Sequence, residues 1–197
     1  MRLVCLLFLV SAAASAQPAD SPAARRPRVS SLSLSPAGVA FQLDADPGGR
    51  GRNLLAGSID YQRTVGPAPV IAQVGASFSA ELFGGDELVE AHVAVGASGS
   101  GGPVLFSATV GPSLARVRRS LSGDPDFLDG RAVTLPGLYA SARAILVVVP
   151  KVGFGVEAFA HVDAKLPLAG GRLVFAFGRL PGALVPNPPP TPRRPGP

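Results

Sequence analysis

Apolar residues occupy every second position of the segment 70–82. Val70, Val74, Phe78 and Leu82 lie on even positions with alanines between them, whereas the odd positions are mostly glycine and polar residues. A period of two gives an extended strand one apolar face and one polar face. The same four residues would also align as an i, i+4 stripe on a helix, so this segment alone leaves both structures open.

Repetition of this alternation along the chain favours strands. The repeating segments are rich in Val and Gly, are separated by turn residues and lack helix caps. Eight can be counted, and an even number is typical of bacterial single-chain barrels. The expected fold class is all-β, an eight-stranded antiparallel up-and-down transmembrane β-barrel. The expected strands cover residues 38–44, 54–64, 70–82, 89–96, 104–114, 138–148, 152–163 and 172–180.

The first residues have the features of an export signal. A charge at Arg2 precedes an apolar run at 3–10, and Ala-Ser-Ala before residue 17 supplies the small residues of a cleavage site. Cys5, the one cysteine of the sequence, lies inside this signal, so we expect no disulfide and no cysteine metal site in the mature chain. The expected organisation is a signal peptide at 1–16, a flexible segment at 17–37, the barrel at 38–180 and a proline-rich disordered tail at 181–197.

Composition narrows the ways in which such an exported chain can fold. Charged residues make up 16% of the sequence, below the roughly 25% of typical soluble domains. No later apolar run approaches the roughly 20 residues that a membrane-spanning helix needs. The net charge is +5, but an exported protein with most of its arginines in loops and tails is not expected to bind nucleic acid. A closed barrel is the remaining common way for so apolar a chain to cross a membrane.

The residue types on the polar face indicate which side of the barrel meets lipid. If the apolar face lined the interior, the protein would be a soluble, lipocalin-like lipid-binding barrel, and its outer surface would need many lysines and acids. The polar face instead consists mainly of Gly, Ser, Thr and Gln, which suit the narrow interior of eight strands. We therefore expect the apolar face to point towards lipid, including Val74, Phe78, Val93, Val110 and Phe154.

The connections between the strands agree with an outer-membrane barrel. If the amino end is periplasmic, the turns after the second, fourth and sixth strands are short, and the longest break, at 116–136, lies outside. In the sixth strand Ile145 and Val147 make the second face apolar as well. We expect that end of the barrel to lie near the periplasmic rim or to be plugged.

This pattern over residues 39–180 resembles that of the OmpA/OmpX-type family of small outer-membrane barrels. The resemblance implies an eight-stranded antiparallel barrel without an open pore, located in the outer membrane. It also implies a structural, adhesive or host-contact role. The resulting hypothesis is an outer-membrane protein with a structural or surface-interaction role and no enzymatic activity.

Several charged residues fall on the polar face of their strands. In so narrow an interior a buried charge must be paired, so we expect these residues to form a network that fills the barrel. A metal site from His92, His161 and a glutamate would need all three at one height, which the spacing does not indicate, so no metal or cofactor is assigned. The expected lumen network comprises Asp60, Glu81, Glu90, His92, Arg143, Glu157 and His161.

A barrel enzyme that acts on membrane lipid is the alternative hypothesis. It would need a serine, a histidine and an acid within hydrogen-bond reach. Ser141, His161 and Glu157 form the one loosely plausible set. No nucleophile-elbow signature accompanies them, so no catalytic residue is assigned.

Basic residues are expected in the outward loops, where they are candidates for contact with lipid. The guanidinium group of arginine matches phosphate as a bidentate fork, which suits the phosphates of lipopolysaccharide. The proline-rich tail should be extended and is a candidate for contact with peptidoglycan or another periplasmic partner. The candidate lipopolysaccharide contacts are Arg50, Arg52, Arg116, Arg118, Arg119, Lys165 and Arg172.

Overall fold

The computed structural model describes residues 28–43, 53–65, 69–81, 87–118, 132–164 and 166–184. No helix in these ranges is long and apolar enough to cross a membrane. The strands are β1 (Ser30–Ser35), β2 (Gly38–Gln42), β3 (Asn53–Thr64), β4 (Val70–Glu81), β5 (Glu87–Gly101), β6 (Val104–Arg118), β7 (Val133–Val149), β8 (Val152–Val162) and β9 (Leu168–Arg179).

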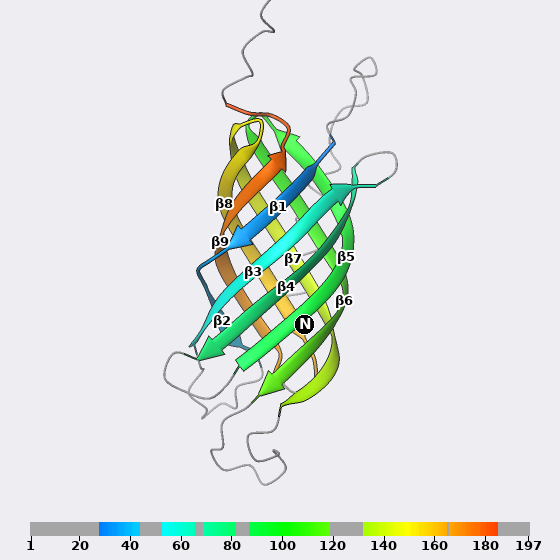
Figure 1. Ribbon diagram of the computed structural model, residues 1–197, viewed down its shortest axis with the longest axis vertical. Coiled ribbons are helices and arrows are strands. Elements are labelled where there is room, and N and C mark those ends of the chain that lie inside the picture. Colours follow the sequence, from blue (N-terminus) through cyan, green and yellow to red (C-terminus); the bar gives the residue numbers. More distant parts are fainter. Residues whose placement is uncertain are drawn as a thin grey trace, which may run out of the picture.

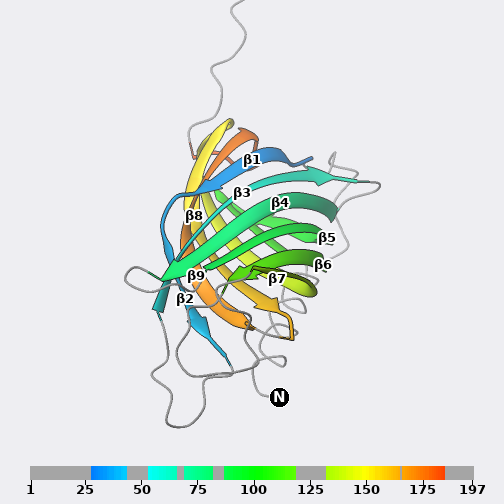
Figure 2. The same cartoon turned by 60° about the horizontal axis from the view of Figure 1, so that its bottom comes forward.

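The strands form one closed antiparallel sheet (Figure 1). β3 to β9 pair in chain order, and β1 and β2 both pair with β3 on one side and with β9 on the other. Together β1 and β2 therefore occupy one position of the ring, and the barrel has eight strands. The predicted eight-stranded antiparallel up-and-down barrel is confirmed. Figure 2 shows the tilted strands following one another around the barrel wall.

A break at Pro36 separates β1 from β2. Ser35 lies opposite Ser58 of β3, whereas Val39, four residues later, lies opposite Leu55, which is three residues from Ser58. The strand thus contains one extra residue, which makes a β-bulge and reverses the positions that point outward. Proline suits this place because it has no N–H to donate to a neighbouring strand.

The structure corrects the expected start of the barrel. Residues 30–35, predicted to belong to the flexible segment at 17–37, form β1 and are part of the wall. Leu32 and Leu34 point outward while the serines at 31, 33 and 35 are buried. Even positions point outward in β1, whereas odd positions do so after the bulge. The alternation of residues 30–35 is therefore out of step with that of residues 38–44. The expected signal peptide at 1–16 and residues 185–197 of the expected tail lie outside the described residues.

The apolar face points away from the barrel axis. Val74, Phe78, Val93, Val110 and Phe154 expose 52%, 47%, 58%, 47% and 50% of their surface. Large exposed apolar side chains of this kind occur on all of β1 to β9 and form an outward apolar belt, as a membrane barrel requires. The predicted orientation is confirmed, and it is opposite to that of a soluble barrel that encloses lipid.

The two ends of the barrel differ in their connections. At the upper end in Figure 1, residues 65–69, 102–103 and 150–151 join successive strands, and we call this the short-turn end. At the other end, called the long-loop end, the connections cover 43–52, 82–86, 119–132 and 163–167. The longest connection lies at the long-loop end, as predicted.

Replacing Val93 by arginine should lower the free energy of unfolding by about 2–4 kcal/mol, because Val93 lies near the middle of β5 within the apolar belt. Arginine at Val70, the first residue of β4, should cost only about 0–1 kcal/mol, because it lies near the edge of the belt. Urea unfolding of the chain refolded into phospholipid vesicles measures both values. Equal losses for the two variants would contradict the orientation of the barrel in lipid.

Candidate functional site

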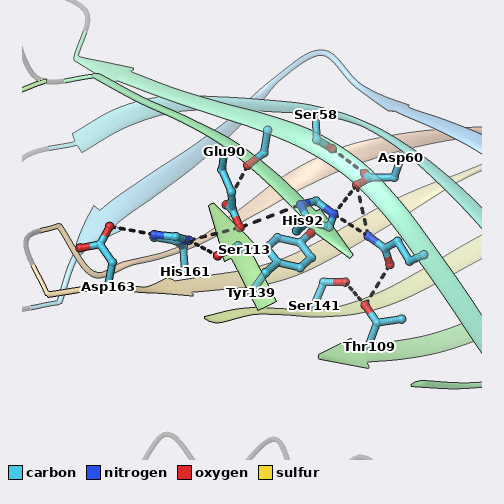
Figure 3. Close-up of polar contacts among 12 residues, drawn as sticks. Ser58, Asp60, Glu90, His92, Thr109, Ser113, Tyr139, Ser141, His161 and Asp163 are labelled. Carbon is cyan, nitrogen blue, oxygen red and sulfur yellow. Dashed lines mark hydrogen bonds and ion pairs between the residues drawn. The ribbon is translucent and has the colours of Figure 1, made fainter. Parts of the chain in front are cut away.

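Charged and polar side chains gather on the inward face of the strands (Figure 3). Six of the seven residues predicted for the lumen are at most 3% exposed, and they come from β3, β5, β7 and β8. The seventh, Glu81, is the last residue of β4 and is half-buried at the long-loop end. The six buried residues are Asp60, Glu90, His92, Arg143, Glu157 and His161.

Arg172 also lies in the lumen, which corrects its predicted position. It was expected in an outward loop, but β9 begins at Leu168, and Arg172 lies opposite Glu157 of β8. The side chain is 3% exposed. The prediction that Arg172 contacts lipopolysaccharide is therefore wrong, because its guanidinium group points towards the interior.

Asp60 is contacted on both carboxylate oxygens. Its Oδ1 lies 3.0 Å from His92 Nε2 and accepts a hydrogen bond from Gln73 Nε2 at 3.1 Å. Its Oδ2 accepts hydrogen bonds from Ser58 Oγ at 2.8 Å and from Arg143 Nη2 at 2.7 Å. These partners lie on β3, β4, β5 and β7, so one carboxylate joins strands from different sides of the barrel.

A second group of contacts surrounds Glu157. Its Oε2 accepts a hydrogen bond from Arg172 Nε at 2.6 Å, and its Oε1 lies 2.9 Å from both Tyr139 OH and Arg143 Nη2. Arg172 Nη2 also donates to Tyr139 OH at 2.6 Å. Arg143 thus bridges Glu157 and Asp60. Two carboxylates face two guanidinium groups, so the charges in the middle of the lumen balance, as buried ions require.

Neutral side chains extend the cluster across the lumen. Gln73 Oε1 accepts hydrogen bonds from Gln62 Nε2 and from Thr109 Oγ1, both at 2.9 Å. Thr109 Oγ1 lies 3.0 Å from Ser141 Oγ. The network therefore reaches from β3 through β4 and β6 to β7.

Two glycines leave space in the lumen for the side chains of Asp60 and His161. Gly75 lies opposite Asp60 in the sheet, and a Cβ at this position would collide with Asp60 Oδ1. A Cβ at Gly137 would lie 2.7 Å from Cε1 of His161. Any larger residue at either position must displace the charged group beside it.

His161 forms a further group of contacts towards the long-loop end (Figure 3). Its Nδ1 lies 3.2 Å from Glu90 Oε1 and 3.3 Å from Ser113 Oγ, and its Nε2 lies 2.8 Å from Asp163 Oδ2. Nε2 thus faces a carboxylate, whereas Nδ1 lies near both a carboxylate and a hydroxyl, and Glu90 Oε1 has no hydrogen-bond partner among the described residues.

The structure does not assemble the serine, histidine and acid considered from the sequence. Ser141 contacts Thr109, and Glu157 contacts Tyr139 and the arginines, while His161 belongs to a different group. Ser113, His161 and Asp163 do lie in a chain of contacts, with Ser113 Oγ 3.3 Å from Nδ1 and Asp163 Oδ2 2.8 Å from Nε2, but the Glu90 carboxylate lies 3.2 Å from the same Nδ1. The described residues include no group of three or more His, Cys, Asp or Glu side chains that could hold a metal ion.

Apolar clusters flank the polar cluster towards both ends of the lumen. Leu184 N donates to the carbonyl oxygen of Val147 at 2.9 Å, so the first residues of the expected tail contact the short-turn end. Ile145 and Val147 lie in the cluster at this end, where the sequence predicted a plug or a rim. That cluster contains Val29, Leu105, Ile145, Val147, Val174, Ala176 and Leu180. The cluster towards the long-loop end includes Ala40, Leu54, Leu88, Ala115, Val117, Phe159, Leu166 and Leu168.

The remaining candidate contacts with lipopolysaccharide lie near the long-loop end or outside the described residues. Arg116 and Arg118 were predicted in a loop, but they are the outward-facing residues at the end of β6. Leu114, two residues before Arg116 on the same face, is 55% exposed and belongs to the apolar belt. Four other candidates, Arg50, Arg52, Arg119 and Lys165, lie outside the described residues.

Sequence reasoning missed several residues that complete the network. Tyr139 is fully buried, and its ring stacks on that of His92 with the centroids 3.7 Å apart and the planes 9° apart. Gln73 of β4 contacts Asp60 of β3 and His92 of β5, and Ser113 of β6 contacts His161 of β8. All three occupy the inward phase of their strands, so that phase was the signal that could have identified them.

Replacing Asp60 by asparagine should lower the free energy of unfolding by about 3–5 kcal/mol, because it leaves Arg143 buried beside one carboxylate instead of two. Glu87→Gln, which changes an exposed acid on the outward face, is the matched control and should change stability by no more than about 0.5 kcal/mol. Urea unfolding in phospholipid vesicles gives both values. A loss for Asp60→Asn as small as that for the control would show that the lumen cluster does not stabilise the barrel.

Comparison with known proteins adds structural relatives. No protein-family model matches the sequence, and no curated protein is significantly similar to it. The crystal structure of Neisserial surface protein A (NspA) is similar with a TM-score of 0.55 and 12% sequence identity, covering 77% of this chain and 97% of NspA. Ail, the attachment invasion locus protein of Yersinia pestis, is similar with a TM-score of 0.54 and 10% identity, covering 79% of this chain and 99% of Ail. The chain therefore has the fold of the small eight-stranded outer-membrane β-barrels.

Proposed function

We propose that this protein resides in the bacterial outer membrane and has a structural or surface-interaction role, with no open pore and no enzymatic activity. The observation that carries this proposal is the filled lumen. Paired charges around Asp60 and Glu157 occupy its middle, and an apolar cluster lies on each side of them. A lumen filled in this way leaves the outer surface and the loops as the parts of the protein that meet other molecules.

Three observations support the location. The outward face of the strands is an apolar belt that suits lipid, and the sequence begins with the features of a signal peptide. The structural relatives NspA and Ail are outer-membrane proteins, and the names of both refer to the cell surface or to attachment. The outward apolar face disfavours a soluble periplasmic barrel that encloses lipid.

The contacts of His161 support a role other than lipid hydrolysis. A serine nucleophile must give its proton to a base in the same step in which it attacks. His161 Nδ1 faces the Glu90 carboxylate at 3.2 Å as well as Ser113 Oγ at 3.3 Å. Nδ1 is thereby shared between a hydroxyl and a carboxylate and is not directed at the serine alone, and His161 joins β8 to β5.

Arg116 and Arg118 are the part of the surface that fits lipopolysaccharide. They extend outward at the long-loop end, immediately beyond the apolar residues of β6. Phosphate groups at that height would meet guanidinium forks that can bind them bidentately. Arg50, Arg52, Arg119 and Lys165 remain candidates for the same contact, and the proline-rich tail remains a candidate for contact with peptidoglycan or another periplasmic partner.

The filled lumen predicts that the protein does not conduct ions. The full chain, refolded and inserted into planar lipid bilayers, should give no stable channel openings, although a shift in gel mobility on boiling should show that the barrel is folded. Stable openings of a folded barrel would contradict a closed lumen.

The proposed location predicts that detergent extraction of the membrane fraction is needed to recover the protein from cells. Recovery in the soluble periplasmic fraction would contradict the location.

Replacing Arg116 and Arg118 together by glutamine should weaken binding to lipopolysaccharide, and raising the salt concentration should weaken binding by the wild type, because ion pairs at an exposed surface are screened. Co-sedimentation with lipopolysaccharide-containing vesicles at several salt concentrations measures the effect. The variant Glu87→Gln, which changes an exposed acid at the same end of the barrel and should not weaken binding, is the control. Unchanged binding of lipopolysaccharide by the Arg116/Arg118 variant would show that these two arginines do not form the contact.

A further inference from the structure

Exposed basic residues form a second patch, at the short-turn end. We define the short-turn basic patch as Arg28, Arg63, Lys151 and Arg179, all of which are exposed. None of the four forms an ion pair with another described residue. The acids of the described ranges lie elsewhere, either in the lumen or at the long-loop end, and they are Asp60, Glu81, Glu87, Glu90, Glu157 and Asp163.

Strand pairing places the members of this patch side by side. Ser30 of β1 lies opposite Arg63 of β3 on one side and opposite Arg179 of β9 on the other. Neighbouring strands are about 4.8 Å apart, so the Cα atoms of the two arginines are roughly 10 Å apart. The carbonyl oxygen of Lys151 accepts a hydrogen bond from Gly178 N at 2.9 Å, which fixes Lys151 beside Arg179.

The patch lies at the edge of the apolar belt. Leu32 is two residues from Ser30 on the same outward face, and it pairs with Tyr61 of β3 and with Phe177 of β9. These three side chains are 40–42% exposed. Two residues of a strand span about 7 Å, so Arg63 and Arg179 lie about that far beyond these apolar side chains. This places their guanidinium groups at the boundary between hydrocarbon and lipid headgroups. Tyr61 OH lies 3.0 Å from Ser30 Oγ, so polar hydroxyls stand between the two arginines.

We propose that the short-turn basic patch binds the phosphates of anionic glycerophospholipids in the leaflet at this end of the barrel. Arg63 and Arg179 flank one position from both sides, so two guanidinium forks can approach one phosphate, and the Ser30 hydroxyl between them supplies a further hydrogen bond. A lipid keeps its acyl chains against Leu32 and Phe177 while its phosphate meets the arginines. This inference rests on the proposed location in a membrane and adds a second lipid class, at the rim opposite Arg116 and Arg118.

A photoreactive phosphatidylglycerol tests the proposal. The full chain is refolded into phosphatidylcholine vesicles that contain a small fraction of this probe, and labelled peptides are mapped by mass spectrometry. We expect labelling at the short-turn ends of β1, β3 and β9. Unlabelled phosphatidylglycerol should compete with the probe, whereas added phosphatidylcholine and inorganic phosphate should not. Because each basic residue near a membrane surface contributes about a fivefold preference for anionic lipid, Arg63→Gln/Arg179→Gln should reduce this labelling about 30-fold.

The controls separate the patch from the rest of the surface and from the proposed function. Arg116→Gln/Arg118→Gln should leave labelling at the short-turn end unchanged. A shift in gel mobility on boiling shows that each variant is folded, and Arg179→Gln alone replaces the double variant if that one does not fold. Undiminished labelling of a folded variant, or equal competition by inorganic phosphate, would overturn the inference while leaving the proposed function intact. If the wild type failed to insert into vesicles, both would be overturned.

Discussion

Hydrocarbon offers no hydrogen-bond partner to a peptide group, and this constraint underlies the rest of the structure. A sheet in lipid must therefore close on itself. β1 and β2 complete the closure, because each pairs with β3 on one edge and with β9 on the other. The bulge at Pro36 is tolerated since pairing resumes on both sides of it. Once the ring is closed, each strand has one face towards lipid and one towards the lumen. The apolar positions of the alternation lie on the first face and the polar positions on the second.

Closure of only eight strands also sets the chemistry of the interior. Eight strands leave just enough room for side chains, so any charge that points inward is buried and must find an opposite charge. Arg143 meets this requirement twice, with Nη2 at 2.7 Å from Asp60 and 2.9 Å from Glu157. Arg172 and Tyr139 complete the surroundings of Glu157. Towards both ends the lumen is filled by apolar side chains, such as Leu54 at the long-loop end and Ile145 at the short-turn end.

The outward surface is organised by height along the barrel axis. Its middle is an apolar belt, and its basic residues lie at the ends of strands, with Arg118 at the long-loop end and Arg63 and Arg179 at the short-turn end. Charge at the middle of a bilayer is costly, whereas near the interfaces it costs little and can meet lipid phosphates. The surface therefore has basic residues at both edges of the apolar belt.

Periodicity by itself determined most of the strands and the two faces of each, because a period of two is a local property of the sequence, and the small polar residues of one face indicated that the other face meets lipid. Together they predicted that Val93 and Phe154 face lipid and that Asp60, Arg143 and Glu157 lie on the polar face. Periodicity missed β1, whose pattern is cut short by a bulge, and Arg172 was counted among the loop residues because residues 166–170, with Pro167 and Gly170, interrupt the alternation. Only the tertiary structure decided which polar side chains meet, such as Tyr139 with Glu157 and His161 with Glu90. Those contacts depend on the register of each strand pair and on the stagger accumulated around the closed ring, and neither is recorded in the spacing of residues along one strand.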